Sequence, residues 1–260
     1  MSTTTREPGA LSPRPGAAPR GRIVLRQALF ELRSTLRNGE QLLLTLAIPL
    51  VLLVGMSKLP ASLVGSDRPV DVVAPGVLAL AVVSTAFTGQ AIAVGFERRY
   101  GVLRLLGATP LGRTGLLVAK TLGVVLVEVV QVALIAAVAL ALGWQPQGSP
   151  AVAGVVLLVG TAAFSALGLL LGGTLRAEGT LAVANGLYLV MLVAGGLVVP
   201  ADRYPAAWQS VVALLPSGAL GDALRSVLAD GAGMPWPQLL VLAVWGAVAG
   251  LVAARVFRWD

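Results

Sequence analysis

The chain of 260 residues contains no cysteine and no histidine. Without cysteine it can form no disulfide, carry out no thiol catalysis and bind no metal through sulfur. Without histidine it lacks the commonest general base and the commonest metal ligand. These absences exclude a histidine-dependent intramembrane hydrolase, and we predict neither a catalytic residue nor a metal site in this chain.

Charged residues are also scarce. They make up 12% of the chain, about half of the roughly 25% that is usual in soluble domains. Hydrophobic residues make up 57%, and the mean hydropathy is +0.86. So few charged residues could not cover the core of a water-soluble globule. The net charge is +7, and the basic residues lie between the apolar runs rather than on one face. We therefore predict an integral membrane protein and expect no nucleic-acid partner.

Six apolar runs approach or exceed the roughly 20 residues that a helix needs to cross the hydrocarbon core. They are the ranges 41–57, 72–96, 115–142, 151–175, 180–199 and 238–256. Residues 1–22 are rich in Pro, Gly, Thr and Arg, which is typical of a disordered tail. Residues 23–40 predict a basic amphipathic helix in the headgroup layer, or alternatively a solvated helix packed on a partner protein. The sequence thus predicts an all-α fold with a six-span domain over residues 41–257.

The distribution of lysine and arginine predicts the orientation. With the N-terminus inside, fifteen of these residues lie on the cytoplasmic side and four on the outer side. Such a bias is typical of multi-pass proteins that keep both termini in the cytoplasm. Abundant Ala, Gly, Val and Arg with scarce Lys further indicates a bacterium with a GC-rich genome. We therefore predict a location in a bacterial cytoplasmic membrane.

Residues 203–230 contain an apolar stretch that a simple reading would count as a seventh span. The stretch is interrupted by Pro205 and Pro216, and charged residues flank it. A further span would also place the C-terminal arginines outside. A broken pair of short helices that dips into the outer leaflet fits the segment better.

The loop after the second span combines a short apolar stripe with several arginines. Val102, Leu105 and Leu106 form the stripe, and Gly107 and Pro110 are expected to end the helix. A short amphipathic helix in this position is suited to transmit motion from a soluble partner. The alternative is an ordinary positively charged cytoplasmic loop that happens to be helical.

This loop resembles the one between the second and third spans of type 2 ATP-binding-cassette (ABC) exporter permeases. The resemblance is carried by Glu97, Gly101, Leu103, Leu106, Pro110, Leu111 and Arg113. It implies a coupling helix at about 97–110 that docks on an ATPase subunit. The residues implied in this coupling are Glu97, Arg98, Gly101, Val102, Leu105, Leu106 and Pro110. The segment at about 203–230 is similar to the re-entrant helices of the same family, and the resemblance covers about residues 23–257.

The chain has no phosphate-binding loop of its own, so it is not expected to be an enzyme. The nearest match, residues 115–121, has Ala119 in place of the second glycine and is one residue short. The resemblance implies that a separate nucleotide-binding ATPase holds ATP and Mg, and that this chain binds no cofactor. It also implies a second permease, either another copy or a related chain, among the membrane lipids. The expected cargo is amphipathic, such as a drug, an antibiotic or a lipid-linked molecule.

Glu128 is the only acidic residue well inside a predicted span, and Gln131 follows one turn later. A charged side chain at the bilayer centre costs roughly 2.5–3.5 kcal/mol on insertion scales unless it faces a cavity or a partner. Glu128, Gln131 and Gln90 are therefore candidates for the translocation path. A structural hydrogen bond of Glu128 is the alternative, and a proton relay there would instead indicate a proton-coupled secondary transporter.

Overall fold

The computed structural model describes residues 18–37, 39–60 and 66–257, and no strand occurs in these ranges. Of the tail predicted at residues 1–22, residues 1–17 lie outside them, as does the C-terminus from residue 258, and a helix begins at Arg20. The first elements along the chain are α1 (Arg20–Arg37), α2 (Gly39–Ser57), α4 (Pro69–Val82), the π-helical η1 (Val83–Gly89), α5 (Gln90–Arg99) and α6 (Val102–Gly107). The remaining elements are α7 (Gly112–Ala141), α8 (Pro150–Thr174), α9 (Ala177–Ala194), the 3-10 turn η2 (Ala201–Arg203), α10 (Ala206–Leu214), α11 (Pro216–Leu228) and α12 (Trp236–Val256).

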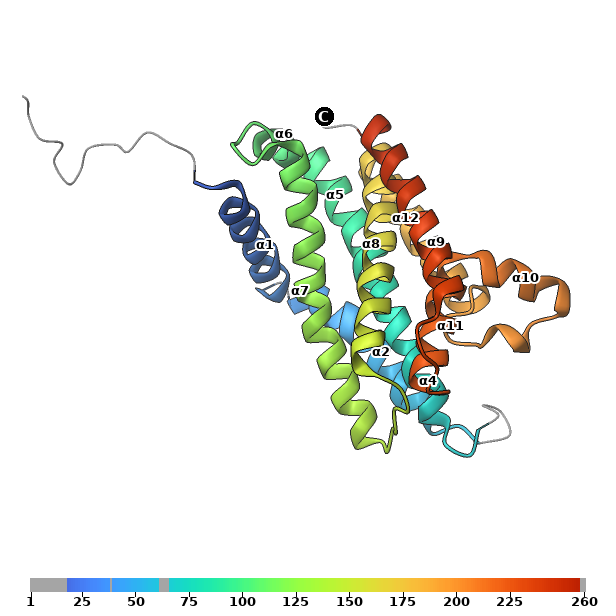
Figure 1. The fold of residues 1–260 in the computed structure, drawn as a ribbon. Helices are drawn as coiled ribbons and strands as arrows, with labels where there is room; N and C mark the ends of the chain where they lie inside the picture. Colours follow the sequence, from blue (N-terminus) through green and yellow to red (C-terminus); the bar gives the residue numbers. More distant parts are fainter. Residues whose placement is uncertain (1–17, 38, 61–65, 258–260) are drawn as a thin grey trace, which may run out of the picture.

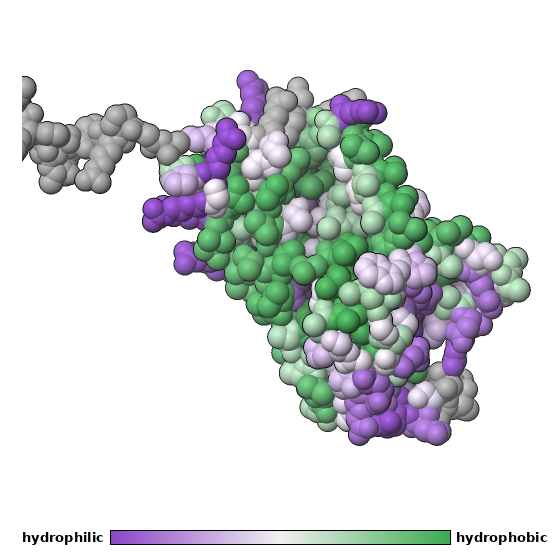
Figure 2. All heavy atoms as spheres, in the orientation of Figure 1, coloured by the Kyte–Doolittle hydropathy of each residue, from purple (hydrophilic) through white to green (hydrophobic). Residues whose placement is uncertain are grey.

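The predicted all-α membrane fold is confirmed. Among the described residues, five helices are long and apolar enough to cross a membrane, with α4, η1 and α5 counted as one. The predicted first span corresponds to α2, whose described apolar part, Thr45–Ser57, is shorter. Figure 2 shows hydrophilic residues at the two ends of the molecule and a broad hydrophobic band between them. Such a band is the surface that a bilayer covers.

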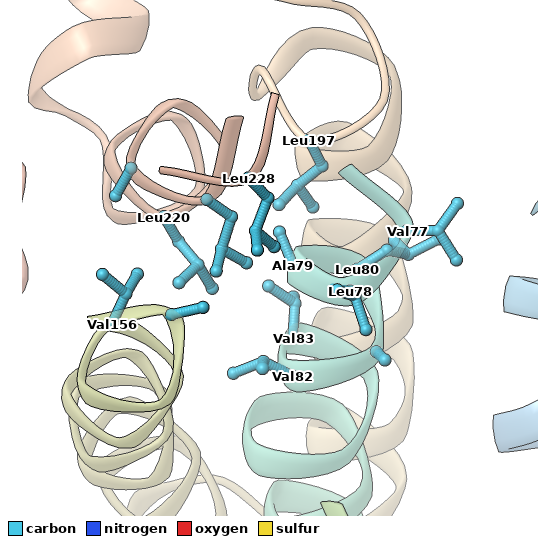
Figure 3. Close-up of a cluster of buried hydrophobic side chains, with 14 of the residues drawn as sticks. Val77, Leu78, Ala79, Leu80, Val82, Val83, Val156, Leu197, Leu220 and Leu228 are labelled. Carbon is cyan, nitrogen blue, oxygen red and sulfur yellow. The ribbon is translucent and has the colours of Figure 1, made fainter. Parts of the chain in front are cut away.

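The second span is the centre of the bundle (Figure 1). In its most apolar window 83% of the residues are buried, against 22% for both α9 and α12. This segment is apolar on all sides and contains many small residues, so neighbouring helices can surround it. Figure 3 shows Val77, Leu80 and Val83 of this span in one cluster with Val156 of α8 and residues of α11.

Helix α8 lies directly against the second span because glycine lets the two backbones approach. A Cβ atom at Gly168 would lie 2.8 Å from the carbonyl oxygens of Ala86 and Phe87, and one at Gly172 would lie 2.5 Å from that of Ala91. These glycines therefore serve packing within the chain.

The prediction that the fifth span continues to Val199 is wrong. Helix α9 ends at Ala194, and Gly196 follows with a φ of +79°, a left-handed conformation that favours glycine. Arg225 of α11 donates to the carbonyl oxygen of Gly196 at 2.9 Å and to that of Leu197. The buried guanidinium thus binds carbonyl groups of the turn that follows the helix.

Residues 206–228 form a sharply bent helix pair. Helices α10 and α11 meet at Leu215 with a bend of 92°. Pro216 begins the second helix, since a proline tolerates the first helical position but cannot continue a preceding helix. Figure 1 shows α10 projecting from the side of the bundle. This geometry agrees with the broken pair predicted from the prolines.

Candidate coupling and translocation sites

The predicted coupling segment is two helices rather than one. Glu97 and Arg98 belong to the last turn of α5, which ends at Arg99. Gly101 then takes a φ of +73°, and the short helix α6 begins at Val102. A single helix starting at Glu97 is therefore wrong, because the left-handed glycine redirects the chain. Figure 1 places α6 at the same end of the bundle as the C-terminal end of α12.

The apolar stripe predicted on α6 divides between the inside and the surface. Leu106 is half-buried and packs with Leu103, which is buried, in a small cluster that includes Leu116 of α7. Leu105 is 73% exposed and Val102 37% exposed. Tyr100, in the preceding turn, is 71% exposed. We call Tyr100, Val102 and Leu105 the exposed loop face; Pro110 is exposed beyond it, after the end of α6.

Glu97 takes part in a buried ion triad with Lys120 and Glu31. The Lys120 ammonium lies 2.7 and 2.6 Å from the two carboxylate oxygens of Glu97, and 3.1 Å from Oε1 of Glu31. Only 5% of the Lys120 side chain is exposed, against 23% for each glutamate. Lys120 therefore connects α1, α5 and α7. Sequence reasoning missed this triad, although Glu31 is the only acidic residue of α1.

The arginines at the end of α5 contact the segment where α8 ends and α9 begins. Arg98 donates to the carbonyl oxygen of Leu175, and Arg99 forms an ion pair with Glu178 in the first turn of α9. The end of the second span is thus attached to α1 and α7 on one side and to α8 and α9 on the other. A displacement of α6 would therefore reach several spans.

The three path candidates do not line one cavity. Gln131 is 2% exposed; its amide oxygen accepts from Thr85 at 2.8 Å, and its amide nitrogen donates to the carbonyl oxygen of Thr45 at 2.8 Å. Gln131 is therefore a structural link between α7, η1 and α2. Gln90 lines a chamber of about 60 Å³ that Glu31 and Lys120 also line. That volume suits water rather than a transported molecule.

Glu128 lies on another side of α7, facing α8. Its side chain is 5% exposed, and Thr161 donates a hydrogen bond to its Oε2. Both residues line a groove of about 350 Å³ between the two helices. Of the three candidates, only Glu128 borders a space large enough for a small organic molecule.

Comparisons with known proteins agree with this architecture. The model of the ABC-2 type transporter family matches residues 27–229, from α1 to the end of α11. The chain is 24% identical over 245 residues to the "Putative transport permease YvfS" of Bacillus subtilis (strain 168). That match covers 91% of this chain and 97% of the relative. The family match favours a permease of an ABC transporter over the proton-coupled alternative. The chain belongs to the ABC-2 type transporter family.

Proposed function

We propose that the chain is the permease subunit of an ATP-driven exporter that moves an amphipathic molecule across a bacterial cytoplasmic membrane. The exposed loop face carries this proposal, because it presents apolar side chains at a charged end of the bundle. Arg104 and the neighbouring loop arginines would hold this end at the cytoplasmic surface. Apolar side chains exposed at that surface would be buried if they entered a groove on a soluble subunit.

The partner would be a nucleotide-binding ATPase that holds ATP and Mg, while this chain carries out no bond chemistry. Hydrolysis would move α6, and the movement would pass to the spans through two sets of contacts. The ion triad connects the end of α5 with α1 and α7, and the Arg99–Glu178 pair connects it with α9. A second permease, either another copy or a related chain, would complete the path.

The proposed orientation predicts a labelling pattern in intact cells. Arg104→Cys should resist a membrane-impermeant maleimide until the cells are opened, because the loop faces the cytoplasm. Gly233→Cys should react at once; Gly233 is exposed, and no described atom lies within 4 Å of a Cβ atom built there. The native chain has no cysteine, so each variant reports one position. Labelling of Arg104→Cys from outside would contradict the orientation.

Co-purification tests the proposed function directly. The affinity-tagged chain, extracted from its own host in mild detergent, should retain an ATPase in a fixed ratio, and the complex should hydrolyse ATP. We expect the ATPase to be retained because the exposed loop face would be buried against it. A chain that transports in vesicles under a proton gradient, without a bound ATPase and without ATP, would overturn the proposal.

A further inference from the structure

The groove between α7 and α8 has apolar walls around one carboxylate. It lies beside the middle of α7 and the first half of α8. Gly154 widens it, since no described atom lies within 4 Å of a Cβ atom built at that position. The apolar side chains that line it include Val125, Val129, Val132, Leu157 and Leu158. The volume of about 350 Å³ falls within the range of sites for small organic ligands.

Among the described residues, Glu128 is the only ionisable one that lines the groove. Its Oε2 accepts from Thr161, but its Oε1 is buried and has no hydrogen-bond partner in the described part of the chain. The two glutamates of the triad share Lys120, whereas no lysine or arginine of the described ranges lines this groove. A carboxylate in an apolar environment is costly unless a positive charge comes close to it.

We propose that this groove binds lipophilic cations, in which one positive charge is enclosed by an apolar frame, and that Glu128 recognises the charge. The proposal rests on the transport function proposed above and specifies a class of cargo. The walls would remove the apolar frame from water or lipid, and the free Oε1 would approach the charge. Anions would be repelled, and strongly hydrated cations would lose water that the apolar walls cannot replace.

The outer rim of the groove offers a route of entry from the bilayer. Val129 of α7 is 61% exposed and Leu158 of α8 is 56% exposed. Lipophilic cations concentrate in membranes, so a site that opens towards the lipid would meet them where they are abundant.

A second copy of the chain is the alternative occupant that could cover the same rim. Charge complementarity favours the cation, because a second copy would have to bury the unpaired Glu128 oxygen.

Tetraphenylphosphonium and tetraphenylborate form a matched pair of probes with the same shape and opposite charge. We expect the full chain in nanodiscs to bind tetraphenylphosphonium above the level of empty nanodiscs, and to bind tetraphenylborate no better than they do. Glu128→Gln keeps the size of the side chain and removes its charge, so it should weaken tetraphenylphosphonium binding by at least about tenfold. Equal binding of both probes, or unchanged affinity in Glu128→Gln, would overturn the proposal.

Filling the groove provides a second test that leaves Glu128 in place. Gly154→Leu should abolish binding by occupying the open space. The control Gly186→Leu on α9, where a Cβ atom also meets no described atom within 4 Å, should not. Normal binding by Gly154→Leu would exclude the groove as the binding site.

Oxidative cross-linking of Leu158→Cys between copies, together with absence of probe binding, would show that a second chain covers the rim. Binding is measured without ATP, and co-purification of the ATPase is scored separately. A loss of probe binding therefore does not affect the test for the ATPase, and a loss of the ATPase does not affect the binding test.

Discussion

Replacing Lys120 by methionine is expected to destabilise the chain strongly. Methionine keeps most of the side-chain volume but leaves the Glu31 and Glu97 carboxylates facing each other without a cation. Breaking a buried ion pair by removing one partner costs about 3–5 kcal/mol. Both glutamates keep 23% exposure, so we expect the lower end of that range. The midpoint of thermal denaturation in detergent should fall accordingly.

Three comparison variants separate charge from packing. Lys120→Arg keeps the positive charge and should lose less stability. Combining Lys120→Met with Glu31→Gln and Glu97→Gln removes every charge of the triad and should recover most of the loss, since neutral replacement of a whole buried network is often tolerated. Lys58→Met changes the only other lysine of the chain, which is exposed, and should leave the midpoint unchanged. A Lys120→Met midpoint equal to that of Lys58→Met would show that the triad does not hold α1 in place.

The spans could be predicted from the sequence because the length of an apolar run is a local property. Each predicted run corresponds to a helix, and the prolines of residues 203–230 marked the bend before Pro216. The end of α9 could not be found in this way. The run continues to Val199, but the helix ends at Ala194, because the chain turns at Gly196 and Arg225 binds the carbonyl groups there.

The candidate sites were harder to predict because they depend on which helix faces meet. Glu31, Glu97 and Lys120 lie far apart in the sequence, and nothing local pairs them. Glu128 and Gln131 are one turn apart, yet they face different neighbours: α8 for Glu128, and η1 and α2 for Gln131. The apolar stripe of α6 was recognised, but not its division into the buried Leu103 side and the exposed Leu105 side. Residue spacing gives the face of a helix, and only packing decides which neighbour covers it.

Leu105→Asp is expected to uncouple the chain from the proposed ATPase without affecting the fold. Leu105 is the most exposed apolar side chain of α6, so its replacement disturbs no internal packing. At a contact with the soluble subunit the variant would lose apolar burial worth about 1.5–3 kcal/mol. It would also place an unpaired carboxylate there. A loss of 2 kcal/mol corresponds to about thirtyfold weaker binding. Co-purified ATPase and ATP hydrolysis should both fall sharply.

Two neighbouring positions make this result specific. Leu106→Asp changes a half-buried residue of the internal cluster, so it should lower the thermal stability of the chain itself, whereas Leu105→Asp should not. Ala108→Asp adds the same charge at an exposed position after the end of α6 and should retain the ATPase better. Arg104 and the other basic residues of the loop are unchanged in all three variants, so membrane orientation is held constant. Normal ATPase retention and hydrolysis by a stably folded Leu105→Asp chain would exclude the exposed loop face as the coupling contact.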